Sequence, residues 1–390
     1  MCNHCHSSLL ARTVDLAEEG RGSVFPNPMV GALVVRDGEV ISEGFHRAYG
    51  DLHAEAAALD AAGDAAKDST LYCNLEPCSY EAPEKHQPPC TRRIIAAGVH
   101  RVIIGQLDPN PNIRGRGVRI LRKAGIEVAI EEAPQEFWRF NDAFNTYMAL
   151  GRPFVHLKVA MSLDGRIATA GGDSKWISDE SARREVHALR AERQGIAVGV
   201  VTVLTDDPLL TVRLAEGSDP RPIVFDSSLR TPIEAALVKK RGEELIILAA
   251  EPPAEDPGFN MRKGRLKAMG ARVLTVPAQA GRVDLQRGLE ALSGEGVRSL
   301  LVEGGTTLAT AFLRTNLFDR LTAYLAPIIL GTGIDAVGSL GVQRLAEALS
   351  FEGVRWRALG EQQVFDAYRR GWLESVRASV EEETHVYRTC

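Results

Sequence analysis

The sequence has few cysteines, no long apolar run and no excess of basic residues. Six cysteines in 390 residues are too few for a disulfide-stapled scaffold and suit free thiols or metal ligands. No stretch approaches the roughly 18 consecutive apolar residues of a membrane span, and no basic segment precedes an apolar core at the N-terminus. We therefore expect a cytoplasmic protein without a membrane anchor. The net charge of −5 makes nucleic acid an unexpected partner.

The length of the chain predicts at least two domains, since domains run to about 100–200 residues each. Gly151-Arg152-Pro153 breaks the pattern of periodic segments and marks the expected boundary. The prediction is a first domain over residues 1–150 and a second over 151–390. Residues 380–390 are polar and are expected to form a tail.

Both parts alternate short apolar runs with amphipathic segments, which predicts an α/β fold in each. In the first part, expected strands at 30–35 and 71–75 precede a β-α-β-α series with strands at 102–104 and 126–130. This order predicts a sheet that becomes parallel and is covered by helices. The second part starts with a strand at 154–160 and continues with a helix capped by Ser178. One helix is expected over 134–150.

Three segments of the first domain predict a metal site: His53-Ala54-Glu55, Pro77-Cys78 and Pro89-Cys90. One imidazole and two thiolates suit tetrahedral Zn²⁺ and leave its fourth position for water. Glu55 lies two residues from the expected ligand His53 and is placed to move protons during hydrolysis. The order His-x-Glu, Pro-Cys and a further Cys is typical of zinc deaminases.

The other cysteines favour structural interpretations. Cys73 lies in an apolar strand, which is typical of a buried core thiol. Cys2 and Cys5 lie in a terminal segment with no following ligand pair, which indicates a disordered tail more than a second metal site.

The first domain resembles the deaminase half of the bifunctional riboflavin-biosynthesis deaminase–reductase family. Besides the zinc motif, it contains the family's segments Pro26–Gly31, Asp108–Pro111 and Gly115–Gly117. The resemblance implies a cytidine-deaminase-like three-layer α/β/α fold. It implies Zn²⁺ bound by His53, Cys78 and Cys90, and Glu55 as the catalytic proton carrier. It also implies substrate contacts from Asn27, Asp108 and Asn110.

One segment departs from the family pattern. Eleven residues separate Cys78 from Cys90, which indicates an insertion of about three residues, a change that loops tolerate. The family places a substrate-binding basic residue here, and either Lys85 or His86 could serve. His86 as a fourth zinc ligand is a less favoured alternative, because it would exclude water from the metal.

The second domain resembles the reductase half of the same family. Its glycine-rich turn Glu303-Gly304-Gly305 follows an apolar run and opens a helix, which suits phosphate binding or simple helix capping. The family motifs 158–166, 174–176, 206–213 and 226–227 recur in order. The resemblance implies a dihydrofolate-reductase-like α/β fold that uses NADPH as the hydride donor.

The resemblance also assigns residues of the second domain. Substrate contacts are expected from Ser174, Arg190, Leu210, Arg213 and Glu303. Cofactor contacts are expected from Ala160, Trp176, Thr202, Asp206, Ser227, Gly305, Thr306, Thr307, Leu308, Ala309, Thr310 and Ala311. Arg190 and Arg213 suit a sugar phosphate, since guanidinium groups bind phosphate in a bidentate manner. Asp206 is a candidate proton relay or a group that positions the nicotinamide, and Arg230 is a candidate contact for the 2′-phosphate of the cofactor.

The resemblance therefore implies a homo-oligomeric enzyme with two activities and a small-molecule substrate. The zinc domain would hydrolyse the 2-amino group of a ribosylamino-pyrimidinone 5′-phosphate, and the second domain would reduce the ribose with NADPH. The first alternative is a nucleic-acid base deaminase with an accessory domain, which requires a basic groove. The second alternative is a non-catalytic scaffold that holds zinc and senses nucleotides.

Overall fold

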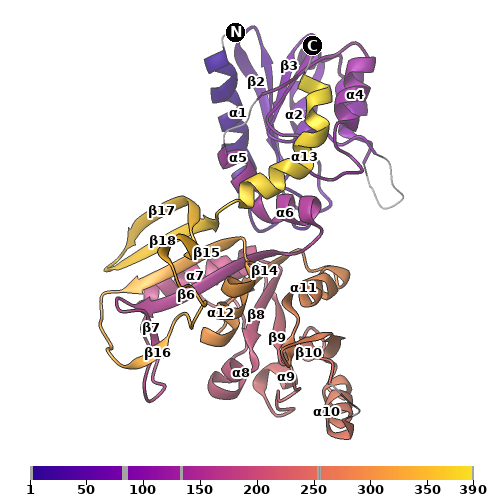
Figure 1. Cartoon of the computed structure of the whole chain (residues 1–390). Coiled ribbons are helices and arrows are strands. Elements are labelled where there is room, and N and C mark those ends of the chain that lie inside the picture. Colours follow the sequence, from indigo (N-terminus) through magenta and orange to yellow (C-terminus); the bar gives the residue numbers. More distant parts are fainter. Residues whose placement is uncertain (1–2, 81–86, 132–134, 253, 255, 389–390) are drawn as a thin grey trace. The chain divides into compact units, whose positions relative to one another are not determined.

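The structure, a computed structural model, describes residues 3–80, 87–131, 135–252, 254 and 256–388, and the chain forms two compact units (Figure 1). Unit 1 comprises Met1–Gly151 and Leu373–Cys390, and unit 2 comprises Arg152–Trp372. The units meet in sequence at Gly151, whose φ of 67° ends the preceding helix. The last segment joins unit 1 and is helical up to Arg388. The polar tail expected over 380–390 is therefore wrong for most of its length.

Unit 1 is built on a five-stranded sheet in the order β2-β1-β3-β4-β5. Its strands are β1 (Gly31–Arg36), β2 (Glu39–Phe45), β3 (Thr70–Cys73), β4 (Arg101–Ile104) and β5 (Glu127–Ile130). Its helices are α1 (Asn3–Glu18), α2 (Ala54–Ala62), α3 (Cys90–Ala96), α4 (Arg116–Lys123), α5 (Gln135–Phe140), α6 (Asp142–Leu150) and most of α13 (Trp372–Arg388). The strands β2, β1 and β3 pair antiparallel, and β3, β4 and β5 pair parallel, as the sequence predicts.

Helices cover both faces of this sheet. Leu10 of α1 and Phe137 of α5 pack with Leu33, Tyr72 and Ile103 on one face. Successive strand residues point to opposite faces, and α2 packs against β1 and β2.

The single helix expected over 134–150 is wrong, because Asn141 divides it into α5 and α6. The Asn141 side chain accepts a hydrogen bond from Met29 N and donates one to Met29 O, both at 2.9 Å. This amide pairing holds Asn141 at φ −103° and ψ 41°, outside the helical region.

Unit 2 is built on a nine-stranded sheet in the order β11-β10-β9-β8-β14-β6-β15-β18-β17. Two further sheets have two strands each, β12-β13 and β16-β7. The strands of unit 2 are β6 (Phe154–Ser162), β7 (Arg166–Thr169), β8 (Gly195–Gly199), β9 (Arg221–Phe225), β10 (Ile246–Ala250), β11 (Arg272–Val276), β12 (Ala278–Gln279), β13 (Arg282–Val283), β14 (Ser299–Val302), β15 (Arg320–Ala326), β16 (Gly333–Asp335), β17 (Phe351–Leu359) and β18 (Gln362–Arg369). Its helices are α7 (Glu180–Glu192), α8 (Val200–Asp206), α9 (Ala236–Arg241), α10 (Pro257–Ala268), α11 (Leu285–Gly294) and α12 (Thr306–Thr315). The neighbouring strands β11, β10, β9, β8, β14, β6 and β15 pair in parallel, and β18 and β17 extend the sheet with antiparallel pairing.

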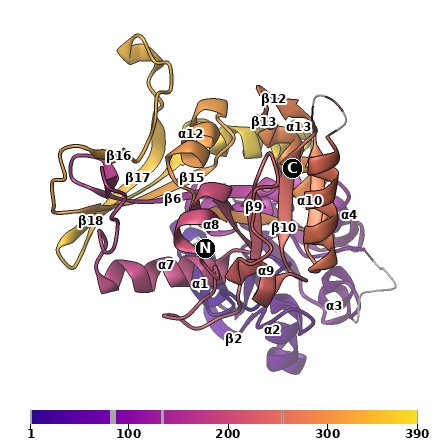
Figure 2. The ribbon, with the colours of Figure 1, turned by 90° about the horizontal axis from the view of Figure 1, so that it is seen from below.

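Two apolar layers enclose the parallel part of this sheet. One face packs Ile223 and Leu248 against Leu289 of α11 and Phe312 of α12. The other face packs residues such as Val224 against α8, α9 and α10. The helix α10 lies near β10, the strand next to the edge strand β11 (Figures 1 and 2). Both faces are thus covered, as parallel strands require.

Two regions of unit 2 differ from the sequence expectations. Helix α7 begins at Glu180 and is capped by Asp179 rather than by Ser178, because the Asp179 side chain accepts a hydrogen bond from Ala182 N at 2.8 Å. The strands β15, β17 and β18 were not predicted, and β17 is mostly exposed, which obscures its apolar pattern. Within the residues described, no helix has both the length and the apolar character needed to cross a bilayer.

Candidate active sites

Unit 1 brings the three predicted metal ligands together. His53 Nδ1 lies 3.5 Å from Cys78 Sγ and 3.4 Å from Cys90 Sγ, and the three ligand atoms all lie within 4.8 Å of one another. Such a group of one imidazole and two sulfurs suits Zn²⁺ with an open fourth position. Across the described residues, it is the one cluster of potential metal ligands from three or more His, Cys, Asp or Glu side chains.

Two helix starts place these ligands. His53 is the extended residue before α2, and Cys90 is the first residue of α3, after Pro89. The Cys90 N–H donates to Cys78 Sγ at 3.3 Å, which favours a thiolate at Cys78. The Cys78 side chain and burial raise the pKa of the Cys90 thiol, and a bound divalent cation opposes this shift by favouring the thiolate.

Glu55 lies in the first turn of α2, directly beside the ligand cluster. It is only 3% exposed, and burial raises the pKa of its carboxyl group. A raised pKa makes the protonated form of a carboxyl group easier to reach, which suits a group that both takes and gives a proton. Glu55 therefore has the position and the chemistry of a proton carrier beside these ligands.

His46 fixes the orientation of Asn27, and the sequence reasoning missed it. His46 Nδ1 lies 2.9 Å from the Leu52 carbonyl, which can only accept, so Nδ1 carries the proton. His46 Nε2 then accepts from Asn27 Nδ2 at 3.0 Å. Burial lowers the pKa of His46, consistent with this neutral tautomer. Asn27 Oδ1 is left available for a ligand.

Glu76 organises the loop that carries Asp108, and it was also missed. Glu76 Oε2 accepts from Asp108 N at 3.2 Å and from Gly115 N at 2.9 Å, and Oε1 accepts from Gly117 N at 2.9 Å. Asp108 Oδ1 in turn accepts from Asn110 N at 2.8 Å. Burial, with smaller contributions from Glu76 and Cys78, raises the pKa of Asp108 to about 7.

The remaining predictions for the first domain have mixed outcomes. Cys73 is fully buried in β3, as expected of a core thiol. Lys85 and His86 lie outside the described residues, and so does Cys2. The choice between Lys85 and His86 stays a prediction.

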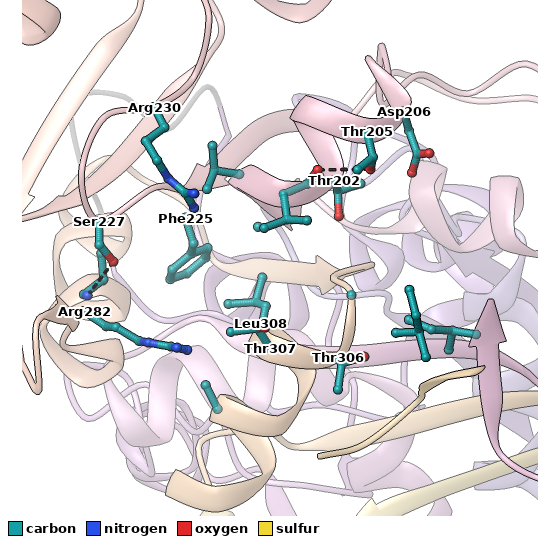
Figure 3. Close-up of a pocket in the computed structure, with 18 of the residues that line it drawn as sticks. Thr202, Thr205, Asp206, Phe225, Ser227, Arg230, Arg282, Thr306, Thr307 and Leu308 are labelled. Atoms are coloured by element: carbon teal, nitrogen blue, oxygen red, sulfur yellow. Dashed lines mark hydrogen bonds between the residues drawn. The ribbon is translucent and has the colours of Figure 1, made fainter. Parts of the chain in front are cut away.

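Unit 2 contains a cavity of about 780 Å³ at the carboxyl ends of its parallel strands, the usual ligand site of such sheets. It is lined by the segments after β8, β9 and β14 (Figure 3). Of the residues expected at the cofactor, Thr202, Asp206, Ser227, Gly305, Thr306, Thr307, Leu308 and Ala311 line it. Ser174, expected at the substrate, lines it as well.

The charges of this cavity are separated. Arg230 and Arg282 lie with Ser227 on one side, and Asp206 lies on the other (Figure 3). Ser227 Oγ accepts a hydrogen bond from Val283 N at 3.1 Å, which ties the Ser227 turn to β13. Between them, the ten-residue helix α12 begins at Thr306 after an extended Gly305, so free backbone N–H groups face the cavity.

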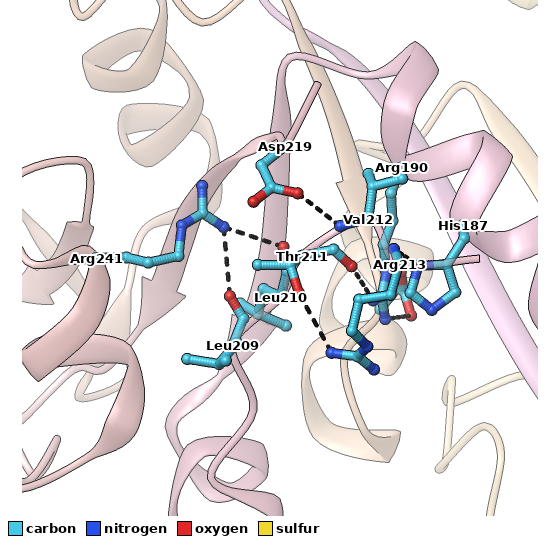
Figure 4. Close-up of polar contacts among 10 residues, drawn as sticks. His187, Arg190, Leu209, Leu210, Thr211, Val212, Arg213, Asp219 and Arg241 are labelled. Carbon is cyan, nitrogen blue, oxygen red and sulfur yellow. Dashed lines mark hydrogen bonds and ion pairs between the residues drawn. The ribbon is translucent and has the colours of Figure 1, made fainter. Parts of the chain in front are cut away.

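Arg190 and Glu303 form a largely buried ion pair, and Arg190 Nη1 also donates to Thr211 O at 2.9 Å (Figure 4). Arg190 Nε donates to Glu303 Oε1 at 2.6 Å and Nη2 donates to Oε2 at 3.0 Å. Burial raises the pKa of Glu303, but the Arg190 guanidinium outweighs it and the pKa lies below its usual value. Because its fork is engaged, Arg190 is not free for the bidentate phosphate contact that the sequence suggested.

Other cations surround this pair. Burial lowers the pKa of His187 to about 4, with help from Arg190 and Arg213, and the neutral His187 Nδ1 accepts from Arg213 N at 3.0 Å. The Arg213 guanidinium is exposed and reaches Thr211 Oγ1 at 3.3 Å. Lys158, absent from the predicted sites, interacts with Glu303, and burial lowers the pKa of its amine. The sequence signal for Lys158 was its position in the family motif at residues 158–166.

Four predicted cofactor residues do not line the cavity: Ala160, Trp176, Ala309 and Thr310. Trp176 is 69% exposed, with the Arg183 guanidinium 4.6 Å from its ring centroid. The Leu210 side chain is buried among core residues, so only its backbone, held at φ 56°, can meet a ligand. Arg241 fixes that backbone by donating to Leu210 O at 3.1 Å (Figure 4).

Family comparisons assign each half of the chain. The model for the cytidine and deoxycytidylate deaminase zinc-binding region matches residues 3–106, and the model for the RibD C-terminal domain matches residues 153–365. The chain is 37% identical over 365 residues to the riboflavin biosynthesis protein RibD of Aquifex aeolicus, covering 93% of this chain and 98% of that protein. It is 38% identical over 365 residues to RibD of Escherichia coli, covering 90% and 96%.

Solved structures agree with these matches. Acinetobacter baumannii RibD superposes with a TM-score of 0.82 at 33% identity, covering 94% of this chain and 99% of that one. A diaminohydroxyphosphoribosylaminopyrimidine deaminase/5-amino-6-(5-phosphoribosylamino)uracil reductase from Thermotoga maritima gives a TM-score of 0.77 at 33% identity, with the same coverage.

Proposed function

The chain belongs to the RibD family of riboflavin biosynthesis proteins and is a bifunctional deaminase and reductase, and we propose that unit 1 carries the first activity and unit 2 the second. The enzyme deaminates 2,5-diamino-6-ribosylamino-4(3H)-pyrimidinone 5′-phosphate and then reduces the ribosyl group to a ribityl chain with NADPH. The observation that carries the division is the His53–Cys78–Cys90 cluster in one unit and the strand-end cavity in the other.

In the deaminase site, His53, Cys78 and Cys90 would hold zinc, which would supply a water of lowered pKa as the nucleophile for C2. A Glu55 carboxylate oxygen would take up the proton of the attacking water. The same carboxyl group then delivers a proton to the departing amine, so that ammonia leaves. Asn27 Oδ1, oriented by His46, and Asp108 are the proposed contacts to the pyrimidine and its ribose phosphate.

In the reductase site, the residues that line the cavity would hold NADPH, which would supply the hydride for C1′ of the ribose. The backbone N–H groups at Thr306 and Thr307 suit the diphosphate of the cofactor. The exposed Arg213 guanidinium binds the substrate phosphate. As the C1′–O4′ bond breaks, Lys158 donates a proton to O4′, because burial makes its ammonium group a stronger acid.

Metal removal tests the division of labour. Dialysis of the purified enzyme against a zinc chelator is expected to abolish ammonia release from the diaminopyrimidine substrate. NADPH oxidation on 5-amino-6-(5-phosphoribosylamino)uracil should persist, because no metal cluster lies among the described residues of unit 2. Readdition of Zn²⁺ should restore ammonia release. Loss of both activities on chelation would contradict the proposal.

We further propose that Arg230 and Arg282 select NADPH over NADH. Both guanidinium groups line the same side of the cavity, beside Ser227 (Figure 3). The turn that presents Arg230 is rigid, because Asp226 Oδ2 accepts from Thr231 N at 2.6 Å and from Thr231 Oγ1 at 2.7 Å. Two cations on a fixed frame suit the 2′-phosphate that distinguishes the two cofactors.

The double substitution Arg230→Ala with Arg282→Ala is therefore expected to raise the KM for NADPH by about ten- to a hundredfold, the loss of charge-assisted hydrogen bonds. The KM for NADH should stay unchanged. Steady-state reduction of the deaminated substrate with each cofactor measures both values. Arg265→Ala, on the exposed side of α10, is the matched control. An equal rise for both cofactors would argue against a 2′-phosphate site.

The outer strand of unit 2 supports a homo-oligomer. Strand β17 ends the nine-stranded sheet and exposes Val354 to 47% and Trp356 to 60%. A long edge strand with apolar side chains favours pairing with another chain, and we propose a second copy as the partner. Trp356→Glu is expected to lower the mass measured by analytical ultracentrifugation, whereas Met261→Glu on α10 should not. An unchanged mass in both variants would count against this interface.

The state of the thiols supports a reducing compartment, for which we propose the cytoplasm. Cys73, Cys78 and Cys90 are not joined in a disulfide, and zinc binding requires that Cys78 and Cys90 stay reduced. Recovery of the native protein in the cytosolic fraction of its cell would support this placement, and recovery elsewhere would contradict it.

A further inference from the structure

Helix α13 and the loop that follows β4 meet in unit 1, and neither is part of the family matches. The deaminase match ends at residue 106 and the reductase match covers 153–365. Helix α13 starts at Trp372, and its residues from Leu373 onward join unit 1. The loop 108–115 carries Asp108 and Asn110. The role of α13 therefore has to be read from its contacts.

One face of the helix forms a buried apolar stripe. Leu373, Val376 and Val380 are at most 6% exposed. Their spacing of three and four residues places them on one helix face. Glu374 and Ala378 are exposed on the other side. The helix is thus packed through one face, which fixes the position of its backbone.

Arg114 connects that backbone to the loop. The side chain is 7% exposed. Its Nη1 donates to the carbonyl of Ser379 in α13, and its Nη2 donates to the carbonyl of Pro109 at 2.6 Å. Pro109 lies directly between Asp108 and Asn110. One guanidinium group therefore joins the C-terminal helix to the backbone of the proposed substrate residues.

The opposite side of the same loop is held by Glu76, which accepts the N–H groups of Asp108 and Gly115. Glu76, two residues before Cys78, holds the loop on the side of the zinc cluster. Arg114 fixes it toward α13, through a donor that is nearly removed from water and hydrogen-bonds strongly for that reason. The loop is clamped between a carboxylate and a guanidinium group.

We propose that α13 is a positioning element for the deaminase site, which acts through Arg114 to hold Asp108 and Asn110 in their substrate-binding geometry. The inference rests on the proposed role of Asp108 and Asn110 as substrate contacts. It assigns Arg114 and the stripe of Leu373, Val376 and Val380 a role in binding the pyrimidine substrate, apart from the proton transfer by Glu55.

Kinetics of the two activities on the same chain test the proposal. Arg114→Met is expected to raise the KM for deamination by about tenfold, through loss of charge-assisted bonds. The kcat, the bound zinc and the reductase kinetics should be unchanged. Arg114→Lys should recover part of the affinity, because an ammonium group can still donate to Pro109 O. Val376→Ser should raise the same KM, and Ala378→Ser, which adds the same side chain to the exposed face, should not.

The outcomes separate this inference from the proposed function. Unchanged deamination KM in both Arg114→Met and Val376→Ser would overturn it. So would a parallel loss of zinc or of both activities, since α13 would then only maintain the fold. Asp108→Asn tests the premise independently: if it leaves the deamination KM intact, the proposed substrate contacts fail, whatever Arg114 does.

Discussion

Substitution of Glu55 by glutamine is expected to slow ammonia release by about 10²- to 10⁴-fold, the usual contribution of a positioned general acid and base. The amide keeps the size of the side chain and cannot carry the proton from water to the leaving amine. Glu55 is buried beside the metal ligands, so bulk water does not readily take over its proton transfer. Measurement of ammonia release under saturating substrate reports this step.

The same variant should oxidise NADPH at the wild-type rate on 5-amino-6-(5-phosphoribosylamino)uracil, because its change is confined to unit 1. Zinc content should match that of the wild type. Asp60→Asn is the matched control, since Asp60 lies in the same helix, is exposed and pairs with Arg93 on the surface. A Glu55→Gln enzyme that deaminates normally would exclude Glu55 as the proton carrier.

Substitution of Glu303 by glutamine is expected to abolish reduction and to lower the stability of the protein. The Arg190–Glu303 pair is bidentate, and its side chains are 14% and 11% exposed. Removal of one partner of a buried pair costs about 3–5 kcal/mol, because the other charge remains buried and unpaired. Lys158 would also lose the negative charge that supports its ammonium form. Thermal unfolding and NADPH oxidation measure the two effects.

Two further variants separate activity from folding. Arg190→Lys keeps the charge and is expected to preserve most of the stability while reducing the rate of NADPH oxidation, because a single ammonium group cannot reproduce the bidentate geometry. Glu290→Gln removes an exposed partner of Arg287 and should change the stability by less than about 1 kcal/mol. If Glu303→Gln retained full reductase activity, the ion pair would have no role in the reaction.

The zinc cluster and the sheet of unit 1 could be predicted because each depends on short sequence patterns. His53 and Cys90 are recognisable by residue type, and both lie at the start of a helix. Glu76 and His46 could not be found in this way. Their partners are backbone groups and an amide elsewhere in the sequence. No pattern near Glu76 indicates that its carboxylate accepts hydrogen bonds from N–H groups of a later loop and of helix α4.

In unit 2, a cavity at the carboxyl ends of the strands is expected of a parallel α/β sheet. The pairing of Arg190 with Glu303 could not be predicted from the sequence. Arg190 and Glu303 lie 113 residues apart, so the sequence could show two candidate binding residues but not that each satisfies the other. The antiparallel strands β17 and β18 were missed for a related reason. Most of β17 is exposed, so its sequence shows no clear alternation of apolar and polar residues. Its position in the sheet is set by its pairing with β18.

The return of the chain to unit 1 also has a consequence for synthesis. Residues 152–372 are made after the first part of unit 1 and before its last helix. At 5–20 residues per second, that interval is roughly ten to forty-five seconds. A nascent chain would therefore assemble its zinc cluster early and gain its pyrimidine affinity only after the whole of unit 2 has been made and α13 has followed it.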